Sequence, residues 1–124
     1  MFADAKAYSG IAVADMNAAR TFYTDVLGIR TSEEYGLMWL HHPANRDTLI
    51  YEQPAATPAS YTVLNFEIDD IDTAVDHLRA RGVRFETFPE LTQDANGVYR
   101  DEGPFIAWFK DPSGNMLAIV QERP

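Results

Sequence analysis

The sequence contains no cysteine among its 124 residues. Disulfides, thiolate metal sites and cysteine nucleophiles are therefore excluded. No apolar run approaches the roughly 20 residues that a membrane-spanning helix needs, and the first residues lack the pattern of a signal peptide. We expect a soluble, cytoplasmic protein that has no membrane partner.

Basic residues are also scarce, with 10 Lys and Arg against 19 Asp and Glu, for a formal net charge of −9. Such a chain repels the phosphate backbone, so we expect no nucleic-acid partner. The acidic balance favours cationic over anionic ligands, although the same charge also serves solubility alone. No Gly-x-Gly-x-x-Gly string is present, and Ser9-Gly10 lies inside a predicted strand rather than at a strand-to-helix elbow.

What is present is a single-domain length with a 46% hydrophobic share, enough for a packed core. The first half reads as a strand, a helix and three strands. Asp15 is a favourable N-cap for that helix, and Gly28 is a favourable residue to end it. The expected ranges are strand 7–13, helix 16–27 and strands 29–34, 37–42 and 48–53.

The second half repeats this order after a breaker-rich linker at 54–60. Asp70 is expected to cap the second helix, which ends at Gly82. The sequence Asp111-Pro112-Ser113-Gly114 predicts a type I turn, and the polar stretch 89–104 is a candidate lid. The expected ranges are strand 61–68, helix 71–81 and strands 83–88, 105–110 and 115–121.

The two halves therefore form an internal repeat within one α+β domain, with a first module at 1–53 and a second at 61–124. In this alignment Asp15 corresponds to Asp70 and Gly28 corresponds to Gly82, while Ile50 corresponds to Ala118. One helix covers only one face of each module's sheet, so the other face must meet something else. We expect the two free faces to enclose a concave surface.

These motifs resemble the vicinal oxygen chelate superfamily, which includes glyoxalase I, bleomycin-resistance proteins and extradiol dioxygenases. The resemblance spans nearly the whole chain and is carried by 8–16, by Ala19, Phe22-Tyr23 and Leu27-Gly28, by 66–71 and by 109–115. It implies paired βαβββ modules that form a cup-shaped mixed sheet backed by helices. Enzymes of that superfamily usually hold a divalent metal in the cup.

The resemblance also places the usual metal-ligand positions at Tyr8, Ile50, Val63 and Ala118. Three of these side chains are aliphatic and have no electron pair to donate, and tyrosine is a rare ligand. A shift in register could bring in Glu52, which shares a strand face with Ile50. One carboxylate and one phenol still make a poor site, so we expect no metal and no other cofactor.

Aromatic residues are numerous and suit a pocket for a flat or cationic organic molecule. His41 and His42 are adjacent in a predicted strand, so they point to opposite faces and cannot share one ion. We expect no catalytic residue. The predicted ligand-binding residues are Tyr8, Trp39, His41, Ile50, Glu52, Val63, Asn65, Glu67, Tyr99, Phe105, Trp108 and Ala118.

The leading hypothesis is a metal-free small-molecule-binding protein, similar to bleomycin-resistance proteins, that sequesters a cationic or aromatic organic compound as a homodimer. A metal-independent isomerase or lyase is the alternative, with Glu52, Glu67, Tyr8 or a histidine as acid or base. A divalent-metal glyoxalase or dioxygenase is a third hypothesis.

Overall fold

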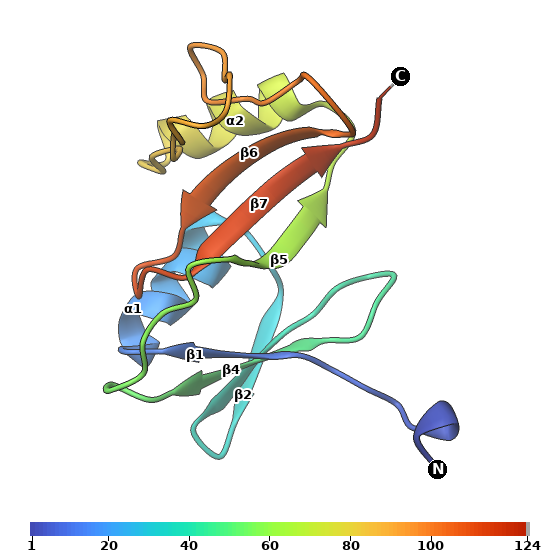
Figure 1. The fold of residues 1–124 in the computed structure, drawn as a ribbon. Helices are drawn as coiled ribbons and strands as arrows, with labels where there is room; N and C mark the ends of the chain where they lie inside the picture. Colours follow the sequence, from blue (N-terminus) through green and yellow to red (C-terminus); the bar gives the residue numbers. More distant parts are fainter. Residues whose placement is uncertain (124) are drawn as a thin grey trace. The chain divides into compact units, whose positions relative to one another are not determined.

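A computed structural model of the chain describes residues 1–123. The chain divides into two compact units, Met1–Thr57 and Pro58–Pro124. The division falls inside the predicted linker 54–60. Each unit contains one mixed sheet, with four strands in the first and three in the second (Figure 1). The predicted α+β class is confirmed. None of the helices in residues 1–123 has the length and apolar character to cross a membrane.

The first unit follows the predicted order of strand, helix and three strands. Its sheet has the strand order β1-β4-β3-β2, in which β1 and β4 are parallel and the other pairs antiparallel. The elements are η1 (Phe2–Asp4), β1 (Gly10–Val13), α1 (Met16–Arg20), η2 (Thr21–Val26), β2 (Thr31–Glu34), β3 (Leu37–Leu40) and β4 (Thr48–Glu52).

Helix α1 begins where the sequence predicts, because the Asp15 carboxylate accepts hydrogen bonds from the N–H groups of Asn17 and Ala18. It continues as the wider π-helix η2, which the sequence did not predict. Gly28 follows with a φ of 72°, the left-handed conformation of a helix C-cap.

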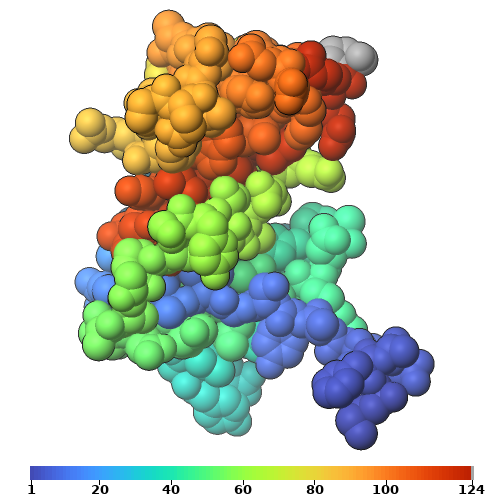
Figure 2. All heavy atoms as spheres, in the orientation of Figure 1, coloured from blue at the N-terminus to red at the C-terminus, as the bar shows by residue number. Residues whose placement is uncertain are grey.

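The N-terminal boundary differs from the prediction, since the first strand begins at Gly10 and not at residue 7. All of residues 1–10 are exposed. Figure 2 shows this end of the chain, in dark blue, projecting from the first unit. Tyr8 therefore lies on an extended segment before β1.

The second unit has the strand order β5-β7-β6, with β5 parallel and β6 antiparallel to the central β7. Its elements are β5 (Thr62–Glu67), α2 (Ile71–Ala80), β6 (Phe105–Lys110) and β7 (Met116–Gln121). The predicted strand at 83–88 is wrong as a regular element, because only Phe85 forms a bridge, to Phe109. The segment contributes ring packing, with the Phe85 and Phe109 centroids 5.8 Å apart.

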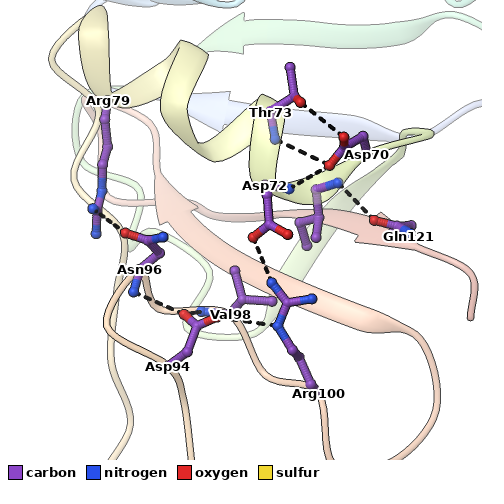
Figure 3. A network of polar contacts seen from close by, with 10 residues as sticks. Asp70, Asp72, Thr73, Arg79, Asp94, Asn96, Val98, Arg100 and Gln121 are labelled. Carbon is purple, nitrogen blue, oxygen red and sulfur yellow. Dashed lines mark hydrogen bonds and ion pairs between the residues drawn. The ribbon is translucent and has the colours of Figure 1, made fainter.

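The stretch 89–104 is fastened to α2 of its own unit, as Figure 3 shows. Arg100 pairs with Asp72 at 2.6 Å and with Asp94 at 3.2 Å, and Arg79 donates to the Asn96 side chain at 2.7 Å. Burial raises the pKa of Asp94, but N–H donation from Val98 and Asn96 and the Arg100 charge outweigh it and lower the pKa overall. The candidate lid is thus anchored to α2 at Asn96 and Arg100.

The predicted turn before β7 is confirmed, with the Gly114 N–H donating to the Asp111 carbonyl at 2.9 Å. Both Asp111 and Asn115 are buried, and the Asp111 carboxylate accepts from the N–H groups of Ser113 and Asn115 and from the Asn115 amide. Gly114 has a φ of +92°, and an added Cβ would lie 3.2 Å from Pro58. This position therefore requires glycine for both conformation and space.

Candidate functional site

The first unit has an open hollow of about 380 Å³ on one face of its sheet. Side chains from four segments line it: the stretch before β1, β2, β3 with the residue after it, and the connection to β4. The lining residues are Tyr8, Ser32, Trp39, His41, Asn45, Arg46 and Asp47. Three of them, Tyr8, Trp39 and His41, are among the ligand-binding residues predicted from the sequence.

This face is the one that α1 leaves uncovered. Arg20 of α1 reaches the Glu33 carboxylate at 2.6 Å, which places Glu33 on the helix side of β2. That guanidinium also lowers the pKa of Glu33 through its hydrogen bonds. Because neighbouring residues alternate, Ser32 and its cross-strand partner Trp39 point to the other side.

Two aromatic rings form the apolar side of the hollow. The Tyr8 and Trp39 ring centroids are 5.0 Å apart at an interplanar angle of 67°, an edge-to-face contact. Tyr8 is 59% exposed even so. A flat ligand can therefore cover ring surface that is now in contact with water.

A continuous chain of hydrogen bonds forms the polar side. His41 Nδ1 lies 2.8 Å from Asp47 Oδ2, and His41 Nε2 lies 2.8 Å from Ser32 Oγ. Asn45 and Arg46 lie in the same connection as Asp47 and complete the lining. The hollow thus combines an aromatic side with donors, acceptors and charges of both signs.

His42 does not belong to this hollow. Its Nε2 lies 2.9 Å from the hydroxyl of the buried Thr48, while His41 contacts Ser32 and Asp47. The two histidines thus make separate sets of contacts, as expected. Burial lowers the pKa of His42, with a smaller opposing effect from Asp47 and a supporting one from His41.

Two predicted site residues in β4 lie on the wrong face for this hollow. The Glu52 carboxylate accepts from the Met16 N–H at 2.8 Å and so lies on the side of α1. Ile50 is two residues earlier, shares that face and is fully buried. Glu52 and Ile50 therefore do not line this hollow, and alternation alone did not say which face a helix would cover.

The sheet pairings also correct the alignment of the two modules by one residue. Leu49 pairs with Gly10, and Ala118 pairs with Asn65; Gly10 and Asn65 stand five residues before the two helix caps, Asp15 and Asp70. The counterpart of Ala118 in the first module is therefore Leu49, not Ile50. Its side chain is aliphatic as well.

In the second unit, three predicted site residues share one face. Asn65, Ala118 and Trp108 are cross-strand neighbours, and Gln121 accepts from the first N–H of α2, which places Ala118 on the face away from that helix. Asn65 is exposed, whereas Ala118 is fully buried.

The Trp108 ring is itself covered. The Phe88 ring lies 5.3 Å from Trp108 edge to face, and the Tyr99 ring lies 6.4 Å away. Trp108 and Tyr99 therefore pack together within their own unit, and each ring covers part of the surface of the other.

The remaining predicted residues are placed differently. Val63 falls at the bulge in β5 between Thr62 and Leu64, and Glu67 is exposed at the end of that strand. Phe105 pairs with Gln121 on the α2 side, where the guanidinium groups of Arg100 and Arg123 lie 4.9 and 5.2 Å from its ring. Phe105 and Trp108 lie on opposite faces of β6, so the structure does not bring these two predicted residues together.

The residues present do not fit a divalent metal at the positions that the superfamily uses. The ligand positions Tyr8, Val63 and Ala118 are unchanged by the corrected alignment, and Leu49 takes the place of Ile50. Three of the four positions therefore have a side chain without a donor atom. In residues 1–123 there is also no group of three or more His, Asp or Glu side chains arranged to hold an ion.

Sequence reasoning missed Ser32, Asn45, Arg46 and Asp47. The sequence offered a signal for Ser32 in the break at Tyr35-Gly36, which in the structure is a two-residue hairpin loop with positive φ at both residues. Such a loop fixes the pairing of Ser32 with Trp39. For Asp47 no local signal exists, since its position depends on the path of the chain from His42 to β4.

Comparison with known proteins gives a family. The family model described as "Glyoxalase/Bleomycin resistance protein/Dioxygenase superfamily" matches residues 7–119. No curated protein sequence matches the chain significantly.

Solved structures resemble the chain over almost its full length. A member of the same superfamily from Sphaerobacter thermophilus is 25% identical with a TM-score of 0.72, covering 98% of this chain and 100% of its own. TnmS3, an antibiotic binding protein from a Streptomyces species, is 23% identical with a TM-score of 0.70, covering 94% and 93%. The oxidase ChaP-H2 is 23% identical with a TM-score of 0.67, covering 94% and 91%.

Proposed function

Because the chain belongs to the glyoxalase/bleomycin resistance protein/dioxygenase superfamily, we propose that it binds a small aromatic organic molecule in the hollow of residues 1–57, without a metal ion. The observation that carries this proposal is the contact of the exposed Tyr8 ring with the half-buried Trp39 ring, beside the polar chain of Ser32, His41 and Asp47. Apolar walls with a few placed polar groups are typical of small-molecule sites.

The likeness to an antibiotic binding protein supports this class of ligand. Its identity of 23% shows the fold alone, so the argument for this chain rests on the hollow. The overall charge of −9 favours a cationic ligand. Arg46 lines the hollow as well, however, so we propose the aromatic ring rather than the charge as the recognised feature.

Of the groups in the acid–base alternative, Glu52 is excluded from the hollow, because its carboxylate accepts from the N-terminus of α1, whereas Tyr8 and His41 line the hollow. A metal-dependent reaction is disfavoured by the aliphatic side chains at the ligand positions. We also propose that the protein is a homodimer, as the superfamily resemblance implies. Sedimentation should then give about twice the chain mass of 14.0 kDa, and a purely monomeric boundary would contradict it.

The binding test compares substitutions of the two tryptophans of the chain, one inside the hollow and one outside it. Bleomycin and a panel of planar aromatic antibiotics, cationic and neutral, are titrated into the wild type and into Trp39→Ala and Trp108→Ala by calorimetry. Loss of a buried aromatic contact costs about 1–3 kcal/mol, so Trp39→Ala should weaken binding about tenfold or more. Trp108→Ala is the matched control and should bind as the wild type does.

Two outcomes would overturn the proposal. One is the absence of heat with every compound in the panel. The other is an equal loss of affinity in Trp108→Ala, which would remove the hollow as the binding site.

A further inference from the structure

The side chains of Ser32, His41 and Asp47 form a hydrogen-bonded series, serine to histidine to aspartate, as in the catalytic triad of serine hydrolases. Ser32 lies in β2, His41 directly follows β3 and Asp47 directly precedes β4. Both contacts of the imidazole are 2.8 Å long, within the range for good hydrogen bonds. A hydroxyl, an imidazole and a carboxylate thus come from three separate segments and meet in one hollow.

The proton positions follow from the chemistry of the partners. An ionised Asp47 only accepts hydrogen bonds, so His41 Nδ1 must carry the proton and donate it. In a neutral imidazole the Nε2 atom then has a lone pair, and it accepts from the Ser32 hydroxyl. This tautomer is the one in which a histidine can take the proton of an attacking serine.

We propose that Ser32 is the nucleophile of an esterase activity on aryl esters, with His41 as general base and Asp47 as a positioning residue. The inference uses the hollow of the proposed function and adds a reaction to it. Ser32 Oγ forms a bond to the ester carbonyl carbon while its proton passes to His41 Nε2. The carbon–oxygen bond to the leaving alcohol then breaks, and that oxygen takes the proton from His41.

Water completes the cycle. It loses a proton to His41, adds to the acyl group on Ser32 and releases the carboxylic acid as the proton returns to Ser32 Oγ. The sum is ester plus water to acid plus alcohol, so no oxidant, metal or cofactor is consumed.

The rest of the hollow suits this class of substrate. The Tyr8–Trp39 pair offers ring surface to an aryl group. Arg46 and Asn45 are exposed, line the same hollow and carry N–H donors, the kind of group that stabilises the charge developing on a carbonyl oxygen. Ser32 is exposed and the His41 side chain is 37% exposed, so a substrate can reach the serine and its base.

The hydrogen bonds of His41 to Ser32 and Asp47 would also be present if their role were only to fix the chain segment before β4. The two roles differ in reactivity, since only an activated serine reacts with a fluorophosphonate. The chain contains four serines, and Ser9, Ser60 and Ser113 are internal controls for labelling at Ser32.

The test incubates the full chain with a fluorophosphonate and maps the adduct by mass spectrometry, then follows hydrolysis of p-nitrophenyl acetate. We expect the adduct at Ser32 and its loss in Ser32→Ala. We expect a fall of about 100-fold or more in hydrolysis in His41→Gln, the scale of general-base catalysis. Ser60→Ala should change neither. Labelling of Ser32 at the level of Ser60, or unchanged labelling in His41→Gln, would overturn the proposal.

The positioning role of Asp47 needs a measurement that reports the protonation of the His41 ring and not only the stability of the loop. The ¹⁵N signals of the His41 ring should report the Nδ1–H tautomer in the wild type. In Asp47→Ala we expect loss of that signature together with a lower rate, and partial recovery in Asp47→Glu. An unchanged ring spectrum would contradict a positioning role. Calorimetry of the wild type with the aromatic panel is read separately from labelling and hydrolysis, so failure of this reaction is distinguishable from failure of binding.

Discussion

The carboxylate of Glu52 accepts a hydrogen bond from the main-chain N–H of Met16 at 2.8 Å, across 36 positions of sequence. Asp15 caps the next two N–H groups of α1 but does not reach this one. The second unit repeats the arrangement, since the Gln121 amide oxygen accepts from the Ile71 N–H at 2.8 Å while Asp70 caps the two groups that follow. In both units the last strand therefore completes the cap of the helix.

Removal of this acceptor should destabilise the first unit. Glu52→Ala leaves the Met16 N–H without its partner and takes a negative charge from the helix N-terminus, so we expect a loss of about 1 kcal/mol in the free energy of unfolding. Urea denaturation measures it. Glu52→Gln keeps an acceptor oxygen, as Gln121 does, and should lose clearly less. Equal losses in the two variants would show that the charge rather than the hydrogen bond matters.

The buried turn before β7 should be more sensitive. Asp111→Ala removes three acceptor contacts made by one carboxylate, to Ser113 N–H, Asn115 N–H and the Asn115 amide. We expect a cost of about 2–3 kcal/mol, because the donors stay buried without a partner. Thermal and urea unfolding measure the effect, with the exposed Asp101→Ala as control. A loss no greater than that of the control would contradict this account.

These local features are also where the sequence was informative. Asp15, Asp70 and Gly28 act through residues a few positions away, as does the turn that begins at Asp111, and each was predicted. The faces of Ile50, Glu52 and Phe105 could not be predicted, because a period of two residues gives alternation but not the side on which a helix packs. The chain of Ser32, His41 and Asp47 required the pairing of three segments at once.

The side chain of His42 should make the free energy of unfolding depend on pH near neutrality. Burial lowers its pKa below the ordinary value of 6.5, so the unfolded chain binds more protons than the folded one as the pH falls. Stability should therefore decrease as the pH falls through 6.5 and stop decreasing below the folded pKa. Urea unfolding of the wild type and His42→Gln between pH 7.5 and 5.5 measures this.

The comparison isolates one group, because both proteins keep His41 and Asp47. We expect a smaller pH dependence in His42→Gln than in the wild type. Identical pH profiles would show that the folded state does not disfavour the charged form of His42.

The position of β7 between β5 and β6 has a consequence for the order of events during synthesis. Neither β5 nor β6 has a ladder partner until residues 116–121 have left the ribosome, and the first N–H of α2 lacks its acceptor until Gln121 has emerged. In the first unit, β1 gains its ladder partner and the first N–H of α1 gains its acceptor when β4, which contains Glu52, has emerged. We therefore expect co-translational folding to proceed in two steps, each set off by the arrival of a single closing strand.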